Sequence, residues 1–488
     1  MLLTDLSKKI KHYHMQGSID GITIESIEMN SREVENGALF VCLEGFTVDG
    51  HEFVEDAINN GAVAIVSQKP ISASVPVIQV ADTIKALAIL ADAFYDSPSN
   101  ELNIIGVTGT NGKTTLTYLL DEIYTKAGKK TAVIGTIEMK IGDDTYPVAN
   151  TTPDALFLHK NLRKMVNQNV DTVIMEVSSH ALSLGRVYGV DFNRVCFTNL
   201  SQDHLDYHKD MDEYAYAKSL LFAQLGNKFS DEKSAIVNAD SPYSRMMERA
   251  TSHPVISYGI DSNALVSATN IHLSPRGLVF DINTSNGNFS VETNLTGKFN
   301  VYNMLAAVGV AVSDNVSTST IQEALEAVKG VPGRFEAVKS EAPYTVIVDY
   351  AHTPDSLENV LLSIEELKEN RVITIVGCGG DRDRSKRPKM ANIAMEYSDY
   401  VVFTSDNPRS EEPATILEDM TDGLTQTHYE VIENRKDAIN AVIGEADEGD
   451  IILIAGKGHE TYQEINGIKH HFDDRETALE AINSNLKE

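Results

Sequence analysis

A glycine-rich segment over residues 106–115 carries the strongest chemical signal in the sequence. It follows an apolar strand expected over residues 103–107 and precedes a helix whose apolar side chains share one face. Glycines allow backbone N–H groups to point at phosphate oxygens, while Lys113 reaches the terminal phosphates and the Thr114 hydroxyl can bind Mg²⁺. The strict phosphate-loop pattern is not met, because Val107 stands where it requires glycine, so an ordinary glycine-rich turn is the alternative. The position between strand and helix favours ATP or GTP binding.

Carboxylates and histidines that could serve the metal of a nucleotide site follow the next two strands. Glu176 ends the strand expected over residues 172–175, and two serines and a histidine follow at 178–180. After a further strand at 195–198 come two aspartates and two histidines, namely Asp203, His204, Asp206 and His208. Carboxylates and imidazoles at this spacing can bind a divalent metal. A solvated strand end and surface histidines are the alternatives, and the neighbouring glycine-rich segment favours the metal.

A basic segment stands out later in the chain. Residues 377–389 carry five cations within eight positions, namely Arg382, Arg384, Lys386, Arg387 and Lys389. Two further polar segments, 406–409 and 456–460, also follow strands, and the carboxyl ends of parallel strands meet at one edge of a sheet. Arginines there can hold carboxylates through paired hydrogen bonds. We interpret the three segments as a binding site, with a solvated charge run as the alternative.

The elements that must position these residues predict an α/β fold in three parts. Turn-rich clusters at 97–100 and 330–333 follow helix-like stretches and divide the chain into domains 1–99, 100–331 and 332–488. The middle domain alternates strands and helices and carries a β insertion at about 266–295. Strands of the outer domains are expected at 39–43, 62–66, 76–80, 345–348, 372–376, 400–404 and 451–455. Such alternation is typical of parallel sheets, with a central phosphate-loop ATPase and a doubly wound, Rossmann-like third domain.

Composition excludes several classes of protein. The 488 residues include 41 Lys plus Arg against 71 Asp plus Glu, a formal net charge of −30, which argues against nucleic-acid and membrane-surface partners. Three separated cysteines exclude a disulfide framework and a thiolate zinc cluster and fit a reducing compartment. Neither a signal peptide nor a membrane-spanning apolar stretch is evident. We therefore expect a cytoplasmic protein, monomeric because no assembly motif stands out.

Eight segments together resemble the Mur ligase family of peptidoglycan assembly, over essentially the whole chain. They are residues 108–115, 150–154, 175–180, 203–208, 333–336, 349–355, 406–409 and 456–460. The resemblance implies three domains that bind the UDP end of one substrate, ATP and an incoming amino acid. It also implies ATP-dependent amide formation, in which a carboxylate of UDP-MurNAc-L-Ala-D-Glu attacks the γ-phosphate to give an acyl phosphate. An amine then displaces phosphate.

The resemblance also implies site residues by position. ATP would be held by Gly109, Thr110, Asn111, Gly112, Lys113, Thr114, Thr115, Asn303, Arg334 and Asp349. Mg²⁺ would be held by Thr114, Glu176 and His204. The UDP-MurNAc dipeptide would contact Ser31, Asn150, Thr151, Thr152, Ser178 and Arg186. The catalytic set would be Lys113, Glu176, His204 and Lys218, where Lys218 matches a lysine that such ligases carry as a carbamate. Without the family, Lys218 is interpreted as a helix-surface lysine.

The amino-acid pocket implied by the resemblance consists of Arg382, Asp406, Asn407, Pro408, Arg409, Gly456 and Glu460. The D-N-P-R form at 406–409 is typical of members that add meso-diaminopimelate, because Arg409 can pair with a distal carboxylate that lysine lacks. The same reaction with L-lysine is the alternative. One departure from the family is Leu184, which stands where some members place glutamine and so puts one substrate hydrogen bond in doubt.

Two alternatives come from other groups of proteins. A folylpolyglutamate synthetase or a muramyl-peptide recycling ligase would share the phosphate loop but should lack segments 406–409 and 456–460. A nucleotide-dependent switch would bind a partner instead of joining molecules, and no guanine-reading motif supports it. All proposed ligands are anions, so the charge of the chain must be uneven. The cations expected to face the cleft are Lys113, Arg186, Arg334, Arg382 and Arg409.

Overall fold

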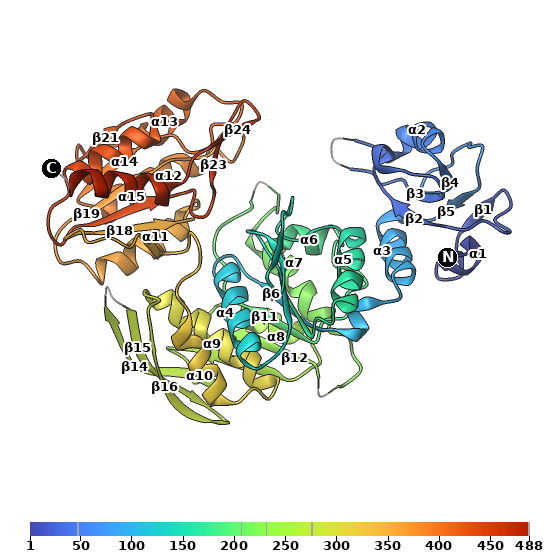
Figure 1. Ribbon diagram of the computed structural model, residues 1–488, viewed down its shortest axis with the longest axis horizontal. Coiled ribbons are helices and arrows are strands. Elements are labelled where there is room, and N and C mark those ends of the chain that lie inside the picture. Colours follow the sequence, from blue (N-terminus) through green and yellow to red (C-terminus); the bar gives the residue numbers. More distant parts are fainter. Residues whose placement is uncertain (46–47, 206, 231, 275–276, 487–488) are drawn as a thin grey trace.

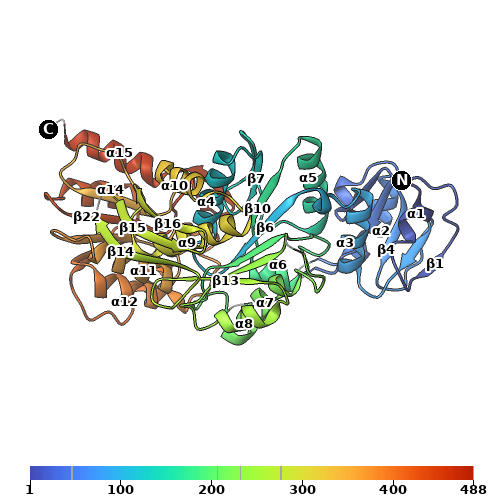
Figure 2. The ribbon, with the colours of Figure 1, turned by 90° about the horizontal axis from the view of Figure 1, so that it is seen from below.

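The computed structural model describes residues 1–45, 48–205, 207–230, 232–274 and 277–486. Three sheets and a two-stranded hairpin follow one another along the chain. Figure 1 and Figure 2 show them spread along the long axis, with the N-terminal part at one end and the C-terminal part at the other. Within the described ranges, no helix is both long and apolar enough to cross a membrane.

The N-terminal sheet has five strands in the order β1-β5-β4-β3-β2. These strands are β1 (His14–Gln16), β2 (Ser26–Glu28), β3 (Ala38–Val41), β4 (Ala62–Ser67) and β5 (Val77–Gln79). The helices are α1 (Leu3–Ser7), α2 (Val54–Asn59) and α3 (Thr83–Phe94), with the short helices η1 (Ser31–Glu33) and η2 (Gly50–Phe53). Every residue of β3 is buried, because α1 and α3 cover one face of the sheet and α2 covers the other.

The central sheet has eleven strands in the order β16-β15-β14-β13-β12-β11-β6-β10-β7-β8-β9. These are β6 (Asn103–Thr108), β7 (Thr131–Ile134), β8 (Met139–Ile141), β9 (Asp144–Tyr146), β10 (Thr172–Glu176), β11 (Arg194–Phe197), β12 (Ser234–Asn238), β13 (Val255–Gly259), β14 (Val266–Ser274), β15 (Gly277–Thr284) and β16 (Gly287–Thr293). The strands from β14 through β12, β11, β6 and β10 to β7 are parallel, and β15, β16, β8 and β9 add antiparallel edges. The predicted β insertion is thus part of the central sheet.

Helices cover both faces of the central sheet. They are η3 (Pro98–Glu101), α4 (Lys113–Lys126), α5 (Ala155–Asn167), α6 (Ser179–Ser183), α7 (Met211–Ala223), α8 (Ser244–Ala250), α9 (Lys298–Ser313) and α10 (Thr318–Ala327). One core packs α4, α9 and α10 against the sheet, and a second packs α5, α6, α7 and α8 against it. Because helices cover both faces, every residue of β10 and β11 is buried, as is typical of parallel strands.

The C-terminal sheet has the order β17-β18-β22-β19-β20-β21 and is parallel except for β17. Its strands are β17 (Glu336–Ala337), β18 (Thr345–Asp349), β19 (Val372–Val376), β20 (Tyr400–Phe403), β21 (Tyr429–Val431) and β22 (Ile451–Ala455). The helices are α11 (Pro354–Glu365), α12 (Lys386–Tyr397), α13 (Pro413–Thr421), α14 (Arg435–Gly444) and α15 (Asp474–Asn485). The hairpin is β23 (Tyr462–Ile465) with β24 (Ile468–His471).

The fold class predicted from the sequence is confirmed. Helices α11, α12 and α13 cover one face of the third sheet while α14 and α15 cover the other, so this sheet is doubly wound. The ends of the predicted strands agree with the structure to within two residues, and those of β19 and β22 agree at both ends. The short edge strands and the hairpin of β23 and β24 were not predicted, because they are brief and lack a buried apolar run.

Candidate active site

The glycine-rich segment forms a tight loop between β6 and α4. Lys113 begins α4, and its ammonium group donates to the carbonyl oxygens of Gly109 at 2.9 Å and of Thr110 at 2.6 Å. Gly112 has φ +85°, and a Cβ there would stand 2.4 Å from the side-chain oxygen of Asn303. Only glycine fits this turn, so the loop curls around the lysine with its N–H groups at the start of a helix, where anions bind.

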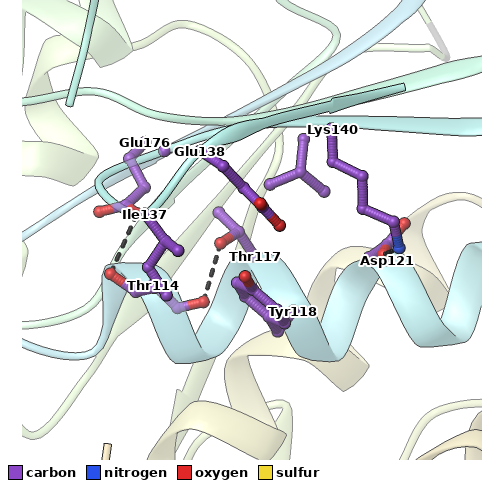
Figure 3. Close-up of a pocket in the computed structure, with 10 residues that line it drawn as sticks. Thr114, Thr117, Tyr118, Asp121, Ile137, Glu138, Lys140 and Glu176 are labelled. Carbon is purple, nitrogen blue, oxygen red and sulfur yellow. Dashed lines mark hydrogen bonds and ion pairs between the residues drawn. The ribbon is translucent and has the colours of Figure 1, made fainter. Parts of the chain in front are cut away.

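A threonine and a glutamate meet beside this loop. The Thr114 hydroxyl donates to Glu176 Oε1 at 3.0 Å, because β6 and β10 are parallel neighbours that end at the same edge. Figure 3 shows the two side chains facing each other at the start of α4. Thr136, which follows β7, donates to both Glu176 oxygens, through its N–H at 2.9 Å and its hydroxyl at 3.1 Å. Oxygen atoms of this kind are the ligands that Mg²⁺ prefers.

Thr136 was not predicted as a site residue. Its hydroxyl also lies 3.1 Å from that of Thr151, so it links Glu176 to the segment expected to bind the UDP substrate. One signal was present in the sequence, because Thr136 follows a strand that neighbours β10, and polar residues at such ends share one edge. Glu176 is therefore oriented from two sides, by Thr114 and by Thr136.

The third domain reaches the phosphate loop through two contacts. Arg334 donates to the Thr114 hydroxyl at 3.1 Å and lies over the Tyr350 ring at 4.5 Å. Asp355, at the start of α11, accepts from the Asn111 amide at 2.7 Å and from the Ser201 hydroxyl at 2.6 Å. A nucleotide on the phosphate loop would consequently touch both the central and the C-terminal domains.

Asp349 ends β18 and is buried beside Arg334. Its carboxylate accepts the N–H of Phe335 at 2.6 Å. Burial raises the pKa of Asp349 to about 6 from its ordinary 3.8, although Arg334 and backbone N–H groups pull it down. The folded protein therefore holds a proton between these pH values that the unfolded chain releases. Stability must fall as the pH rises through this window.

We expect Asp349→Asn to raise the free energy of unfolding by about 1–3 kcal/mol at pH 7.5, and by about half as much at pH 5. The amide is neutral at both pH values and still accepts the Phe335 N–H, so the variant removes the unfavourable buried charge. Calorimetric melting temperatures of both proteins at the two pH values measure the effect. Equal gains at pH 5 and pH 7.5 would contradict it.

Lys218 lies on α7 with its side chain buried, so its interpretation as a helix-surface lysine is wrong. Only 1% of the residue is exposed, and its ammonium group donates to Gly109 O at 2.8 Å and lies 4.4 Å from the Tyr214 ring. Burial and the nearby Lys113 hold the pKa of Lys218 well below its usual value. Burial also lowers the pKa of Lys113, against the opposing charges of Glu176 and Asp203.

The predicted histidine segment contributes a neutral imidazole near the loop. Burial lowers the pKa of His204 to about 4 even though Asp203 Oδ2 lies 3.3 Å from its Nε2. His208 lies 3.0 Å from the Ser179 hydroxyl, and Asp206 falls outside the described residues. In the part of the chain that the structure describes, no three His, Cys, Asp or Glu side chains gather as a metal site. Oxygen atoms of the substrates would have to complete the coordination of any bound metal ion.

Residues expected to bind the UDP substrate surround Thr152. Its hydroxyl donates to Glu176 O at 2.9 Å and accepts the Ser178 N–H at 3.0 Å, and its carbonyl accepts from Arg186 at 3.0 Å. Asn150 lies two residues before Thr152 and is exposed, and Leu184 is the C-cap residue of α6. Ser31 belongs to η1 in the N-terminal part, which lies at the far end of the molecule in Figure 1.

The polar loops after β19, β20 and β22 converge at one edge of the third sheet. Arg409 donates to Gly380 O at 2.7 Å, which joins the first two loops. The Asn407 amide donates to Glu460 at 2.8 Å, which joins the second and third. The remaining members of the expected pocket, Asp406, Pro408 and Gly456, lie in the same loops.

The five cations of segment 382–389 do not all face this edge. Arg387 is fully buried and bonds Glu411 and Asp419 at 2.7–3.0 Å, and Arg384 holds Asp419 with two bonds of 3.0 Å. The interpretation of the whole segment as ligand-binding is therefore wrong for these two arginines, whose acidic partners come from α13 and its preceding loop. Arg382 is exposed and donates to Asp381 O.

Comparison with known proteins identifies the family. Models of the Mur ligase family catalytic domain, the Mur ligase middle domain and the Mur ligase glutamate ligase domain match residues 23–95, 107–311 and 333–458. The UDP-N-acetylmuramoyl-L-alanyl-D-glutamate--2,6-diaminopimelate ligase of Bacillus velezensis is 51% identical over 484 residues, 99% of each chain. The ligase of that name from Bacillus cereus is 53% identical over 465 residues, 95% of each chain.

A solved structure gives the same result. A UDP-N-acetylmuramoyl-L-alanyl-D-glutamate--2,6-diaminopimelate ligase matches with a TM-score of 0.69 and 33% identity, over 95% of each chain. The sequence matches and the shared architecture cover all three sheets. The chain belongs to the Mur ligase family.

Proposed function

We propose that this protein is an ATP-dependent ligase of peptidoglycan precursor synthesis that joins meso-diaminopimelate to UDP-MurNAc-L-Ala-D-Glu. The observation that carries the proposal is the direct contact between the phosphate loop and the domain that holds the Arg409 loops, through Arg334 and Thr114. An enzyme that activates one substrate and joins it to another needs its nucleotide between the two binding sites. The relatives reported above, identical at about half of their positions, carry a name for this activity.

The chemistry follows from the carboxylate, which is a poor electrophile until it is phosphorylated. The substrate carboxylate attacks the γ-phosphate of ATP, ADP leaves, and an acyl phosphate forms. The amine of the diamino acid then attacks the acyl carbon, and phosphate and a proton are released as the amide forms. Two anions must be brought together in the first step, so cations such as Lys113 are needed to reduce their repulsion.

In this scheme the phosphate loop from Gly109 to Thr115 holds ATP, with Asn303, Arg334 and Asp349 completing its site. Thr114, Glu176 and His204 would hold Mg²⁺, which supplies charge neutralisation at the phosphates when bound. The hydroxyl of Thr114 and the carboxylate of Glu176 are oxygen ligands of the kind that Mg²⁺ prefers, whereas the imidazole of His204 is a weaker ligand for this ion. Thr136 keeps Glu176 in place through both carboxylate oxygens.

The UDP-linked substrate is assigned to the N-terminal and central domains, and the diamino acid to the C-terminal domain. With domains at 1–99, 100–331 and 332–488, Ser31 binds the UDP end and the Thr152 cluster binds the dipeptide end. That cluster is Asn150, Thr151, Thr152, Ser178 and Arg186. The diamino acid occupies the loops of Arg382, Asp406, Asn407, Pro408, Arg409, Gly456 and Glu460.

In this proposal Lys218 acts as a carbamate. The protein works as a monomer in the cytoplasm. Burial and the nearby Lys113 hold the pKa of Lys218 well below its usual value, which favours the neutral amine, the form that can attack CO₂. Three buried cysteines without disulfides fit a reducing compartment.

The test of the proposed function is ADP release by the purified protein with ATP, Mg²⁺ and UDP-MurNAc-L-Ala-D-Glu. We expect rapid turnover with meso-diaminopimelate and at least about 100-fold lower kcat/KM with L-lysine, because lysine leaves Arg409 without its carboxylate. Equal or faster turnover with L-lysine would contradict the amino-acid assignment. ADP release that does not require the UDP-linked dipeptide would contradict ligase activity and favour a nucleotide switch.

A further inference from the structure

A buried lysine lies behind the amino-acid loops. Lys457 follows β22, its side chain is 0% exposed, and its ammonium group lies 3.0 Å from Glu460 Oε2 and 3.1 Å from Asn407 Oδ1. The same ammonium lies 5.5 Å from the centre of the Tyr462 ring, on β23. Burying an ammonium group is unfavourable unless charged or polar partners surround it, so Lys457 is held by this cluster of contacts.

The three side chains form a closed triangle of hydrogen bonds. Lys457 donates to both other members, and the Asn407 amide donates to the same Glu460 oxygen at 2.8 Å. The N–H of Glu464 also donates to Asn407 Oδ1, at 2.9 Å. Because an ammonium group and a backbone N–H can only donate, they fix the amide of Asn407 with its oxygen toward them and its NH₂ toward Glu460.

We propose that Lys457 is a positioning residue that sets the diamino-acid site through Glu460 and Asn407. Both donors bind Oε2 of Glu460, so the other oxygen of this carboxylate is kept for an ammonium group of the diamino acid. The inference rests on the proposed function, since it concerns the amino-acid substrate of that reaction.

A neutral residue could not replace the positive charge of Lys457. Its hydrogen bond to Glu460 holds that carboxylate in one orientation before the substrate ammonium arrives. Replacement of Lys457 by an apolar residue leaves Glu460 with the Asn407 amide as its remaining donor and leaves the Asn407 oxygen held by the Glu464 N–H alone. A buried ion pair contributes little net stability, so a positioning role accounts for this one better than a structural role does.

The experiment compares Lys457→Met with Lys469→Met in the full-length enzyme. Lys469 is the matched control, because its ammonium lies 4.0 Å from the centre of the same Tyr462 ring but belongs to the exposed strand β24. We expect Lys457→Met to raise the KM for meso-diaminopimelate about 10- to 100-fold, while the KM values for ATP and the UDP-linked dipeptide change less than about threefold. Lys469→Met should change all three less than about twofold.

A cycle with Glu460→Gln separates positioning from a general loss of structure. If Lys457 acts through Glu460, adding Lys457→Met to the Glu460→Gln enzyme raises the KM for meso-diaminopimelate less than about threefold. The double variant lacks both charges, so the comparison holds even where Lys457→Met alone folds poorly. A further tenfold rise in the double variant, or equal rises of all three KM values in Lys457→Met, would overturn the inference. Wild-type enzyme that does not use meso-diaminopimelate would instead contradict the proposed function.

Discussion

Arg409→Ala is expected to lower kcat/KM for meso-diaminopimelate by about 10²–10³-fold, while the KM for ATP stays within about threefold of wild type. The distal end of this substrate carries a carboxylate, and a guanidinium can hold it with two parallel hydrogen bonds. Loss of the arginine leaves that carboxylate unpaired in a partly buried site, where only 22% of the Arg409 side chain is exposed. The phosphate loop lies in another domain, and the contacts of Arg409 are with Gly380, Glu464 and Asn466 of its own domain.

The local structure holds Arg409 in a defined position. Its backbone takes the left-handed conformation, with φ +53°, and pairs with the hairpin by donating to Glu464 O at 3.0 Å and accepting from Asn466 at 2.7 Å. Its guanidinium already donates to Gly380 O. The side chain is therefore oriented before a substrate arrives, and little conformational freedom is lost on binding.

Steady-state kinetics with each substrate varied in turn measures the effect, with Arg384→Ala as the control. Arg384 belongs to the same basic segment, but its guanidinium is held by Asp419, so its loss should leave all three KM values within about twofold. If Arg409→Ala weakened ATP binding as strongly as it weakens use of meso-diaminopimelate, the assigned role would be wrong. Unchanged selectivity over L-lysine would also contradict it.

The parts of the site that could be predicted are those that local chain geometry determines. Lys113 and Thr114 follow a strand and begin a helix, and that junction by itself points backbone N–H groups at a phosphate. The parallel order of β19, β20 and β22 brings their polar loops to one edge whatever the side chains between them. Both expectations follow from alternating apolar runs and glycines, which the sequence displays directly.

The parts that could not be predicted depend on contacts between distant residues. Arg387 has the same neighbours in sequence as a solvated arginine, and its burial follows from Glu411 and Asp419 on another segment. Lys218 occurs in a helix that looks half exposed in sequence, but the phosphate loop covers it through Gly109. The sequence does not distinguish Thr136 from other threonines, because its role depends on β7 lying beside β10. The order of residues in the sequence does not give the distance in space between such partners.

Lys218→Met is expected to lower kcat by at least about 10³-fold, with no loss of thermal stability. In the proposed form, the neutral amine attacks CO₂, a C–N bond forms, and a proton leaves to give an anionic carbamate. The change turns a buried amine beside Lys113 into a negative group that can help to hold a metal ion. Methionine has a similar length but can neither react with CO₂ nor bind Mg²⁺, so the variant should bind its substrates and fail in the phosphoryl step.

Two measurements distinguish the carbamate from a role of the plain amine. Carbon-13 NMR of the wild-type enzyme in labelled bicarbonate should show a carbamate signal that Lys218→Met lacks, and activity should fall when CO₂ is removed. Lys228→Met is the matched control, because Lys228 is an exposed lysine shortly after the same helix. Its loss should change neither the signal nor kcat. An enzyme that is fully active without CO₂ and without the signal would show that Lys218 works as an amine. In that case its bond to Gly109 O, which shapes the phosphate loop, would be its contribution.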